Sequence, residues 1–118
     1  MKEVLEKVNK LNGVKGSMVI THDGIMVTSA LDGKLDDDTV AALSSSLVLT
    51  LKKAFDPVEK SASPKEMILT AELGKLVFLD LGRAYLVVVT KPKLKLSTDL
   101  VDIRSYARKL EARIHLTT

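Results

Sequence analysis

A chain of 118 residues in which 46% are hydrophobic is long enough to bury one core, and this composition excludes a mostly disordered protein. The net charge of +3 and an aromatic content of 3% are too low for a nucleic-acid-binding tail or a base-stacking surface. The absence of cysteine excludes disulfides, thiolate metal sites and a cysteine nucleophile. We therefore expect a single domain that does not bind nucleic acid.

Residues 2–11 space their apolar side chains three or four positions apart, which predicts an amphipathic helix that ends at Gly13. The segment differs from a signal peptide because no apolar run follows it. No stretch of the chain approaches the roughly 18 apolar residues that a membrane-spanning helix needs. We expect a cytoplasmic protein without a transmembrane segment.

Two short runs rich in β-forming residues, 17–21 and 25–29, flank the connector 22–24. This connector ends in Asp23-Gly24, which supplies the positive φ that a hairpin with a bulge requires. The sequence predicts a β-hairpin here.

The central segment, residues 39–55, predicts a helix with two apolar faces. One stripe holds Val40, Leu43, Leu47, Leu51 and Phe55, and the other holds Ala41, Ala42, Ser45, Val48 and Leu49. A surface helix of a small domain is normally polar on its outer side, but here Lys52 and Lys53 come only at the end. Either a flanking loop covers the second face or another chain does, and the sequence favours another chain.

The acidic run 36–38 is expected to cap the start of this helix, and Pro57 to end it. Three strands follow at 66–73, 75–81 and 84–90. The first of these strands is half polar, so we expect it near a sheet edge. The other two are apolar on both faces, and this pattern indicates a sheet that helices cover on both sides. After an exposed connector, Ser97 or Thr98 is expected to cap a last helix.

Candidate chemistry is sparse along the chain. His22 and His115 are interpreted as solvated side chains, and the acidic run 36–38 as a helix cap rather than a cation site. Asp80 is interpreted as a turn cap held by Arg83 or by a backbone amide. Because no set of convergent groups is present, we predict a non-enzyme with no catalytic residue, no metal site and no cofactor.

The chain resembles the Roadblock domain family, the type of the dynein light chains and of several small-GTPase regulators. The residues that carry the resemblance are the runs LNGVKGSMVI at 11–20, HDGIMVTS at 22–29, ELGKLVF at 72–78 and LGRAYLVVV at 81–89. The likeness covers almost the whole chain and departs from the family at 90–97, where the segment KPKLKL is more basic than expected.

This resemblance implies a single α+β domain over residues 1–118, with the order α-β-β-α-β-β-β-α and a five-stranded antiparallel sheet. The central helix would cover one face of this sheet, and the N- and C-terminal helices the other. It also implies a homodimer in which the central helix and the first strand of 66–90 meet across a two-fold axis. The predicted dimer interface comprises Ala41, Ser44, Ser45, Val48, Leu49, Ile68 and Thr70.

The function implied is a homodimeric, non-catalytic module that binds or regulates a Ras-like small GTPase, with a GTPase-activating or scaffolding role. The candidate partner surface comprises Lys52, Lys53, Lys91 and Lys93. One alternative is a light-chain-like structural subunit of a motor or trafficking complex without nucleotide dependence. Another is a binder of an anionic ligand or membrane surface, through Lys91, Lys93, Lys95 and Arg104.

Overall fold

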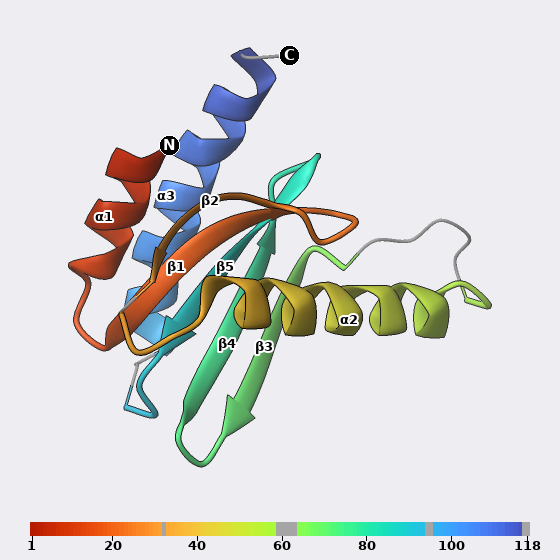
Figure 1. Cartoon of the computed structure of the whole chain (residues 1–118), viewed down its shortest axis with the longest axis horizontal. Coiled ribbons are helices and arrows are strands. Elements are labelled where there is room, and N and C mark those ends of the chain that lie inside the picture. The colour runs from red at the N-terminus through yellow and green to blue at the C-terminus, as the bar shows by residue number, and fades with distance from the viewer. Residues whose placement is uncertain (32, 59–63, 94–95, 117–118) are drawn as a thin grey trace.

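The computed structural model describes residues 1–31, 33–58, 64–93 and 96–116. Its elements are α1 (Lys2–Asn9), β1 (Val14–Thr21), β2 (Met26–Leu31), α2 (Asp37–Phe55), β3 (Glu66–Ala71), β4 (Gly74–Asp80), β5 (Ala84–Thr90) and α3 (Leu96–Leu116). The predicted fold class and the predicted order of helices and strands are confirmed (Figure 1).

The five strands form one antiparallel sheet in the order β2-β1-β5-β4-β3. Strand β5 lies in the middle, where Val87 pairs with Met18 of β1 and with Phe78 of β4. This position explains why β5 is apolar on both faces. Strand β3 lies at one edge, as its half-polar sequence predicted, and β2 lies at the other.

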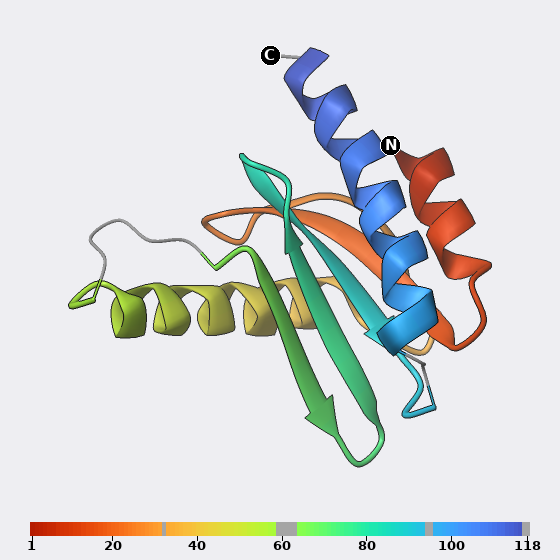
Figure 2. The same cartoon turned by 180° about the vertical axis from the view of Figure 1, so that it is seen from behind.

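Helices cover both faces of the sheet. Helices α1 and α3 lie side by side on one face, and α2 crosses the other, as the resemblance implied (Figures 1 and 2). Arg113 Nη1 of α3 lies 3.3 Å from Glu3 Oε2 of α1. No helix in the described ranges has both the length and the apolar content that crossing a bilayer requires.

The alternation of side chains along each strand builds two separate cores. On β4, Val77 and Leu79 point toward α1 and α3, whereas Phe78 between them points toward α2. The core under α1 and α3 contains Val4, Leu5, Val8, Val19, Val77, Leu79, Leu86, Val88, Leu100, Ile103, Ala107 and Leu110. The core under α2 contains Met18, Ile20, Ala41, Val48, Phe78, Tyr85 and Val87.

The starts of α2 and α3 differ from the sequence prediction. Asp36 takes the N-cap position of α2, but its carboxylate accepts a hydrogen bond from the Thr39 hydroxyl (2.5 Å) and makes none to a helix N–H. Asp37 accepts one from Ser29 (2.6 Å) on β2. Helix α3 begins at Leu96, before both residues that were expected to cap it. At the start of α2, these carboxylates therefore bond side-chain hydroxyls of β2 and of the first helical turn.

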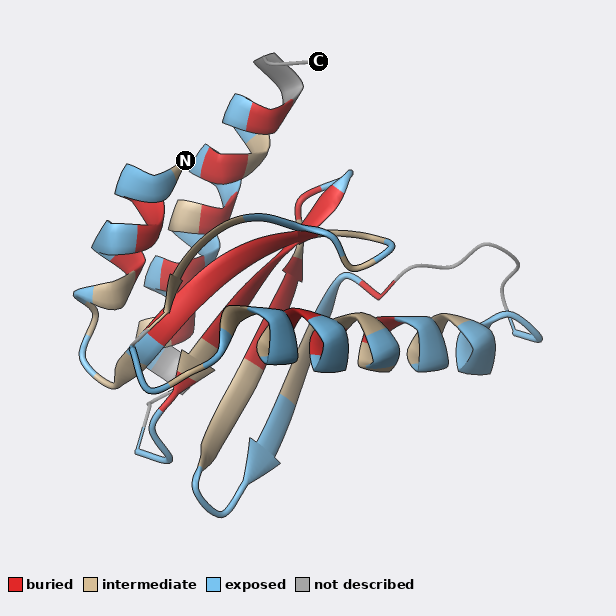
Figure 3. Ribbon diagram, viewed as in Figure 1, coloured by how far each residue is buried: buried red, intermediate tan, exposed pale blue. Residues whose placement is uncertain are grey.

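Helix α2 extends beyond the sheet. In both views its C-terminal half projects past the edge strand β3 (Figures 1 and 2). Residues 53–58 are all exposed, and the end of β3 is exposed as well (Figure 3). The chain thus leaves one end of a helix and one sheet edge uncovered on the same side of the molecule.

Candidate interaction surface

The inner face of α2 packs on the chain's own sheet. Ala41, Ser44 and Val48 are at most 5% exposed, and Ala41 and Val48 share a core with Phe78 and Tyr85. In the single chain these three side chains are covered by their own sheet, and their contact with a second subunit stays a prediction. Small side chains allow a helix backbone to approach a neighbour closely, and here that neighbour is the sheet of the same chain instead of a second helix.

Two further residues of the predicted interface also contact their own chain. A Cβ atom built on Gly24 would lie 2.2 Å from Ser45 Oγ, so Ser45 rests against the turn between β1 and β2. Ile68 is partly buried against the core under α1 and α3. Leu49 and Thr70 remain exposed, and for these two the interface stays a prediction.

Helix α2 carries apolar side chains that are exposed to water. Leu43 is 60% exposed, Leu49 46% and Phe55 47%. Leu43 and Phe55 belong to the stripe that periodicity had grouped with the buried side of the helix. Exposed apolar side chains mark an interaction surface when further apolar surface continues from them.

A groove runs between the projecting end of α2 and β3, and it continues the apolar surface. Its volume is about 600 Å³. The groove is lined by Leu51, Phe55, Pro64, Lys65, Glu66, Met67, Ile68 and Leu69. Sequence analysis did not single out this groove, although the alternation of Met67 and Leu69 on β3 was a signal for it.

A second apolar hollow lies on the α2 side of the sheet, where the strands extend past the helix. Leu69 of β3 pairs with Leu76 of β4, which in turn pairs with Val89 of β5. These three side chains form a row across the sheet and line a hollow of about 370 Å³. Leu76 also packs against the core under α2, which places the row on that face.

Strand β3 has one free edge, because within the described residues it pairs only with β4. The start of the strand is held by Arg104 of α3, whose guanidinium bonds both carboxylate oxygens of Glu66 at 2.9 Å. The hydrogen bonds that Arg104 donates to the Glu66 carboxylate raise the pKa of Arg104 above its ordinary value. An ordered strand with an unpaired edge can accept another strand.

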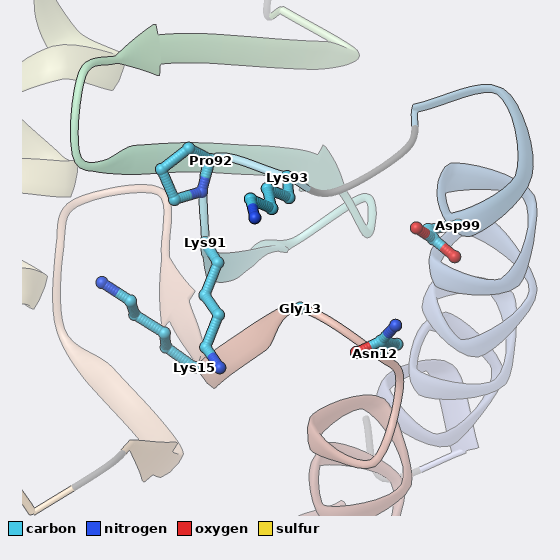
Figure 4. A pocket seen from close by; sticks show the side chains of 7 residues that line it. All are labelled: Asn12, Gly13, Lys15, Lys91, Pro92, Lys93 and Asp99. Atoms are coloured by element: carbon cyan, nitrogen blue, oxygen red, sulfur yellow. The ribbon is translucent and has the colours of Figure 1, made fainter.

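The four lysines of the predicted partner surface do not lie together. Lys52 and Lys53 are on the projecting part of α2, whereas Lys91 and Lys93 follow β5 at a distant end of the sheet (Figures 1 and 2). Lys91 and Lys93 line a hollow together with Lys15, which sequence analysis did not identify (Figure 4). Lys95 lies outside the described residues, and Arg104 is engaged by Glu66.

The half-buried histidine His22 is not a freely solvated side chain. Its Nε2 atom lies 3.3 Å from Asp80 Oδ1, and its ring lies 4.7 Å from that of Tyr85. Asp80 also accepts a hydrogen bond from the Gly82 amide at 2.9 Å, which confirms the turn-cap interpretation. The donor in this cap is the backbone amide of Gly82, so Arg83 is not needed for it. These contacts join the β1–β2 turn to the end of β4.

Within the described part of the chain, no three His, Cys, Asp or Glu side chains are grouped so that they could hold a metal ion. The described residues do present an apolar helix end, an apolar groove and an open strand edge on one side of the fold.

Comparison with known proteins identifies the family. The model of the Roadblock/LC7 domain family matches residues 1–90. The chain belongs to the Roadblock/LC7 domain family. Two proteins of Methanocaldococcus jannaschii, the uncharacterized proteins MJ1340 and MJ0310, are each 32% identical to it over 115 residues. In both cases the alignment covers 92% of this chain and 95% of the relative.

Solved structures share the fold of this Roadblock/LC7 domain. A Roadblock/LC7 domain from Streptomyces avermitilis superposes with a TM-score of 0.82 at 15% identity, covering 100% of this chain and 98% of that one. MglB of Myxococcus xanthus superposes with a TM-score of 0.89 at 16% identity. The superposition covers 98% of this chain and 88% of MglB. The gliding protein mglB of Thermus thermophilus gives a TM-score of 0.78 at 20% identity. The superposition covers 94% of this chain and 85% of that one.

Proposed function

We propose that this Roadblock/LC7 domain is a cytoplasmic, non-catalytic homodimer that binds and regulates a Ras-like small GTPase. The observation that carries the proposal is the free edge of β3 beside the projecting, apolar end of α2. A domain with these two surfaces uncovered at one side has a ready site for a second copy of itself.

The geometry of a two-fold dimer fits these surfaces. Pairing β3 with its symmetry mate would join two five-stranded sheets into one, with α2 and its mate on the same face. The projecting end of each α2 would then extend over the other subunit's sheet. There the row of Leu69, Leu76 and Val89 offers an apolar hollow to receive it. An interface of this kind is self-complementary, as two-fold symmetry requires.

Dimerisation would also place two copies of the outer face of α2 side by side. This face presents Leu43 and Leu49 next to Lys52 and Lys53, a mixture of apolar and basic groups that suits a protein partner. The resemblance to small-GTPase regulators supports a GTPase as that partner. A regulator of this kind needs no catalytic group of its own, because it can act by positioning the switch loops of the GTPase.

Affinity capture from the source lysate tests the partner, with the purified domain as bait and either a GTP analogue or GDP present. The proposal predicts that a Ras-like GTPase is enriched in one nucleotide state. Capture should fail with Leu43→Asp on the outer face and persist with Val101→Asp, which places the same charge on an exposed position of α3. Equal recovery of a non-GTPase subunit in both states would contradict the GTPase role and support the structural light-chain alternative.

A further inference from the structure

Three segments that lie far apart in the sequence meet at the end of the sheet where β1 begins and β5 ends. Lys15 comes from the start of β1, Lys91 and Lys93 from the chain after β5, and Asp99 from the first turn of α3. Figure 4 shows Lys15 and Lys91 together along one side of a hollow, with Asn12 and Asp99 on the opposite side. The hollow has a volume of about 750 Å³.

The backbone around this hollow is fixed by its own hydrogen bonds. The Lys91 amide donates to the Gly13 carbonyl at 2.7 Å, which ties the chain after β5 to the chain before β1. Lys75 Nζ of β4 donates to the Pro92 carbonyl at 3.2 Å and brings a fourth ammonium group to the same end of the sheet. The backbone that carries Lys91 and Pro92 is therefore tied to the chain before β1 and to β4.

The charges of the hollow are unbalanced. Among the described residues, no carboxylate forms an ion pair with Lys15, Lys91 or Lys93. By contrast, Arg104, Arg108 and Arg113 each pair with a glutamate. The positive field of three lysines around a hollow attracts a small anion, and the carboxylate of Asp99 in the same lining offsets only part of their charge.

We infer that the hollow lined by Lys15, Lys91 and Lys93 binds a small anion that carries two or more phosphate groups. Lysine ammonium groups bind phosphate as point charges, and three of them exceed the charge of one phosphate group. The lining residues include no aromatic ring, so nothing on this surface would stack on a nucleobase. Recognition would thus be directed at the phosphates. This inference does not rest on the proposed GTPase role.

Titration of the purified domain with sodium tripolyphosphate tests the site, followed by calorimetry and by NMR shifts of the backbone amides. We expect saturable one-site binding that weakens as salt rises, with the largest shifts at the amides of Gly13, Lys91 and Lys93. The triple variant Lys15→Gln/Lys91→Gln/Lys93→Gln should bind at least about tenfold more weakly, a loss of about 1.4 kcal/mol.

The matched control is Lys2→Gln/Lys52→Gln/Lys53→Gln, which removes the same charge from the surfaces of α1 and α2. It should keep its affinity within about twofold, since screening by salt limits the effect of distant charges. All substituted lysines except Lys52 are exposed, so both variants should fold, which the NMR spectrum checks directly. Equal weakening in the two variants, or no saturable binding to the wild type, would overturn the inference.

A binding experiment with lipid vesicles distinguishes a lipid headgroup from a soluble compound as the source of the phosphates. Vesicles with phosphatidylinositol 4,5-bisphosphate are compared with vesicles that carry the same charge as phosphatidylserine. A preference for the bisphosphate that is lost in the Lys15→Gln/Lys91→Gln/Lys93→Gln variant assigns the site to a lipid headgroup. Binding of tripolyphosphate without such a preference assigns it to a soluble phosphate compound. Equal binding of the wild type to both vesicle types without binding to tripolyphosphate would overturn the site.

Discussion

Ser45 Oγ of α2 lies 2.2 Å from the point that a β-carbon on Gly24 would occupy. The turn between β1 and β2 therefore lies directly against the helix, with no room for a side chain between them. Because Gly24 also has a φ of +90°, two independent constraints require glycine at this position.

The first prediction follows from this contact. Gly24→Ala should lower the free energy of unfolding by about 1–3 kcal/mol, since the new methyl group must displace α2 or the turn. Chemical denaturation with guanidinium measures the change. Gly33→Ala is the control because nothing lies within 4 Å of its added methyl group, and its effect should stay within about 0.5 kcal/mol. Equal effects of the two substitutions would contradict the close packing of α2 on the turn.

The second prediction concerns Ser44, whose buried Oγ has no hydrogen-bond partner among the described residues. Ser44→Ala should leave stability unchanged or raise it by up to about 1 kcal/mol, because it removes an unsatisfied polar group from the core. Ser17 is the matched control, since its buried hydroxyl donates to Asn9 Oδ1 at 2.8 Å. Ser17→Ala should lower the free energy of unfolding by about 1 kcal/mol. A loss of stability in Ser44→Ala as large as that in Ser17→Ala would show that Ser44 has a partner.

The third prediction tests the proposed dimer. Phe55→Asp and Leu69→Arg each place a charge in the groove between α2 and β3, at side chains that are already 47% and 39% exposed in the single chain. Both variants should fold and elute as monomers, because an interface core does not tolerate unpaired charge. Light scattering coupled to size exclusion measures the mass. The control Val101→Asp changes a residue on the opposite face and should remain a dimer. A dimeric Phe55→Asp and a dimeric Leu69→Arg would together refute the placement of the interface.

The fourth prediction concerns pH. The Thr21 hydroxyl donates to the carboxylate of Asp23 and lowers its pKa below the ordinary value of 3.8. A pKa that is lower in the folded state stabilises the fold above the ordinary value, and this contribution is lost as the pH falls through the folded-state pKa. In Thr21→Val the pKa of Asp23 should return toward 3.8.

An NMR titration of the Asp23 carboxyl measures this shift. His22→Gln is the comparison, because the charge of His22 is only a minor cause of the lowered pKa. It should move the pKa less than Thr21→Val does. A larger shift in His22→Gln would assign the lowered pKa to the imidazole instead of the hydroxyl.

Local patterns in the sequence were sufficient to predict the order of helices and strands, whereas the resemblance to the family implied which helices cover which face of the sheet. The sequences of β4 and β5 are apolar on both faces because these strands lie in a sheet with helices on both sides. The sequence of β3 is half polar because this strand lies at an edge. The element order followed from turn residues and hydrophobic periods, which are local properties. The start of α3 at Leu96 was missed, because the sequence rule places a Ser or Thr at the cap and the helix begins before both Ser97 and Thr98.

The interface could be predicted only in part. The sequence shows two apolar stripes on α2, but it does not show which stripe faces the sheet. Val40 and Phe55 lie on one stripe, yet Val40 packs against the core under α2 and Phe55 is exposed. They differ because α2 crosses the sheet and leaves its edge, which depends on the angle between helix and strands. The cluster of Lys15 with Lys91 likewise depends on the pairing of β1 with β5, which joins distant parts of the chain.

The central position of β5 also determines the order in which this domain can fold. Strand β1 borders β5 in the sheet, so Val14 is aligned with Thr90 and the two ends of the chain must meet before either core is closed. The β1–β2 hairpin and the β3–β4 hairpin can form early, because each is local in sequence. During synthesis, the edge of β1 that pairs with β5 would stay unpaired until β5 leaves the ribosome. Folding would then be completed in a late, cooperative step.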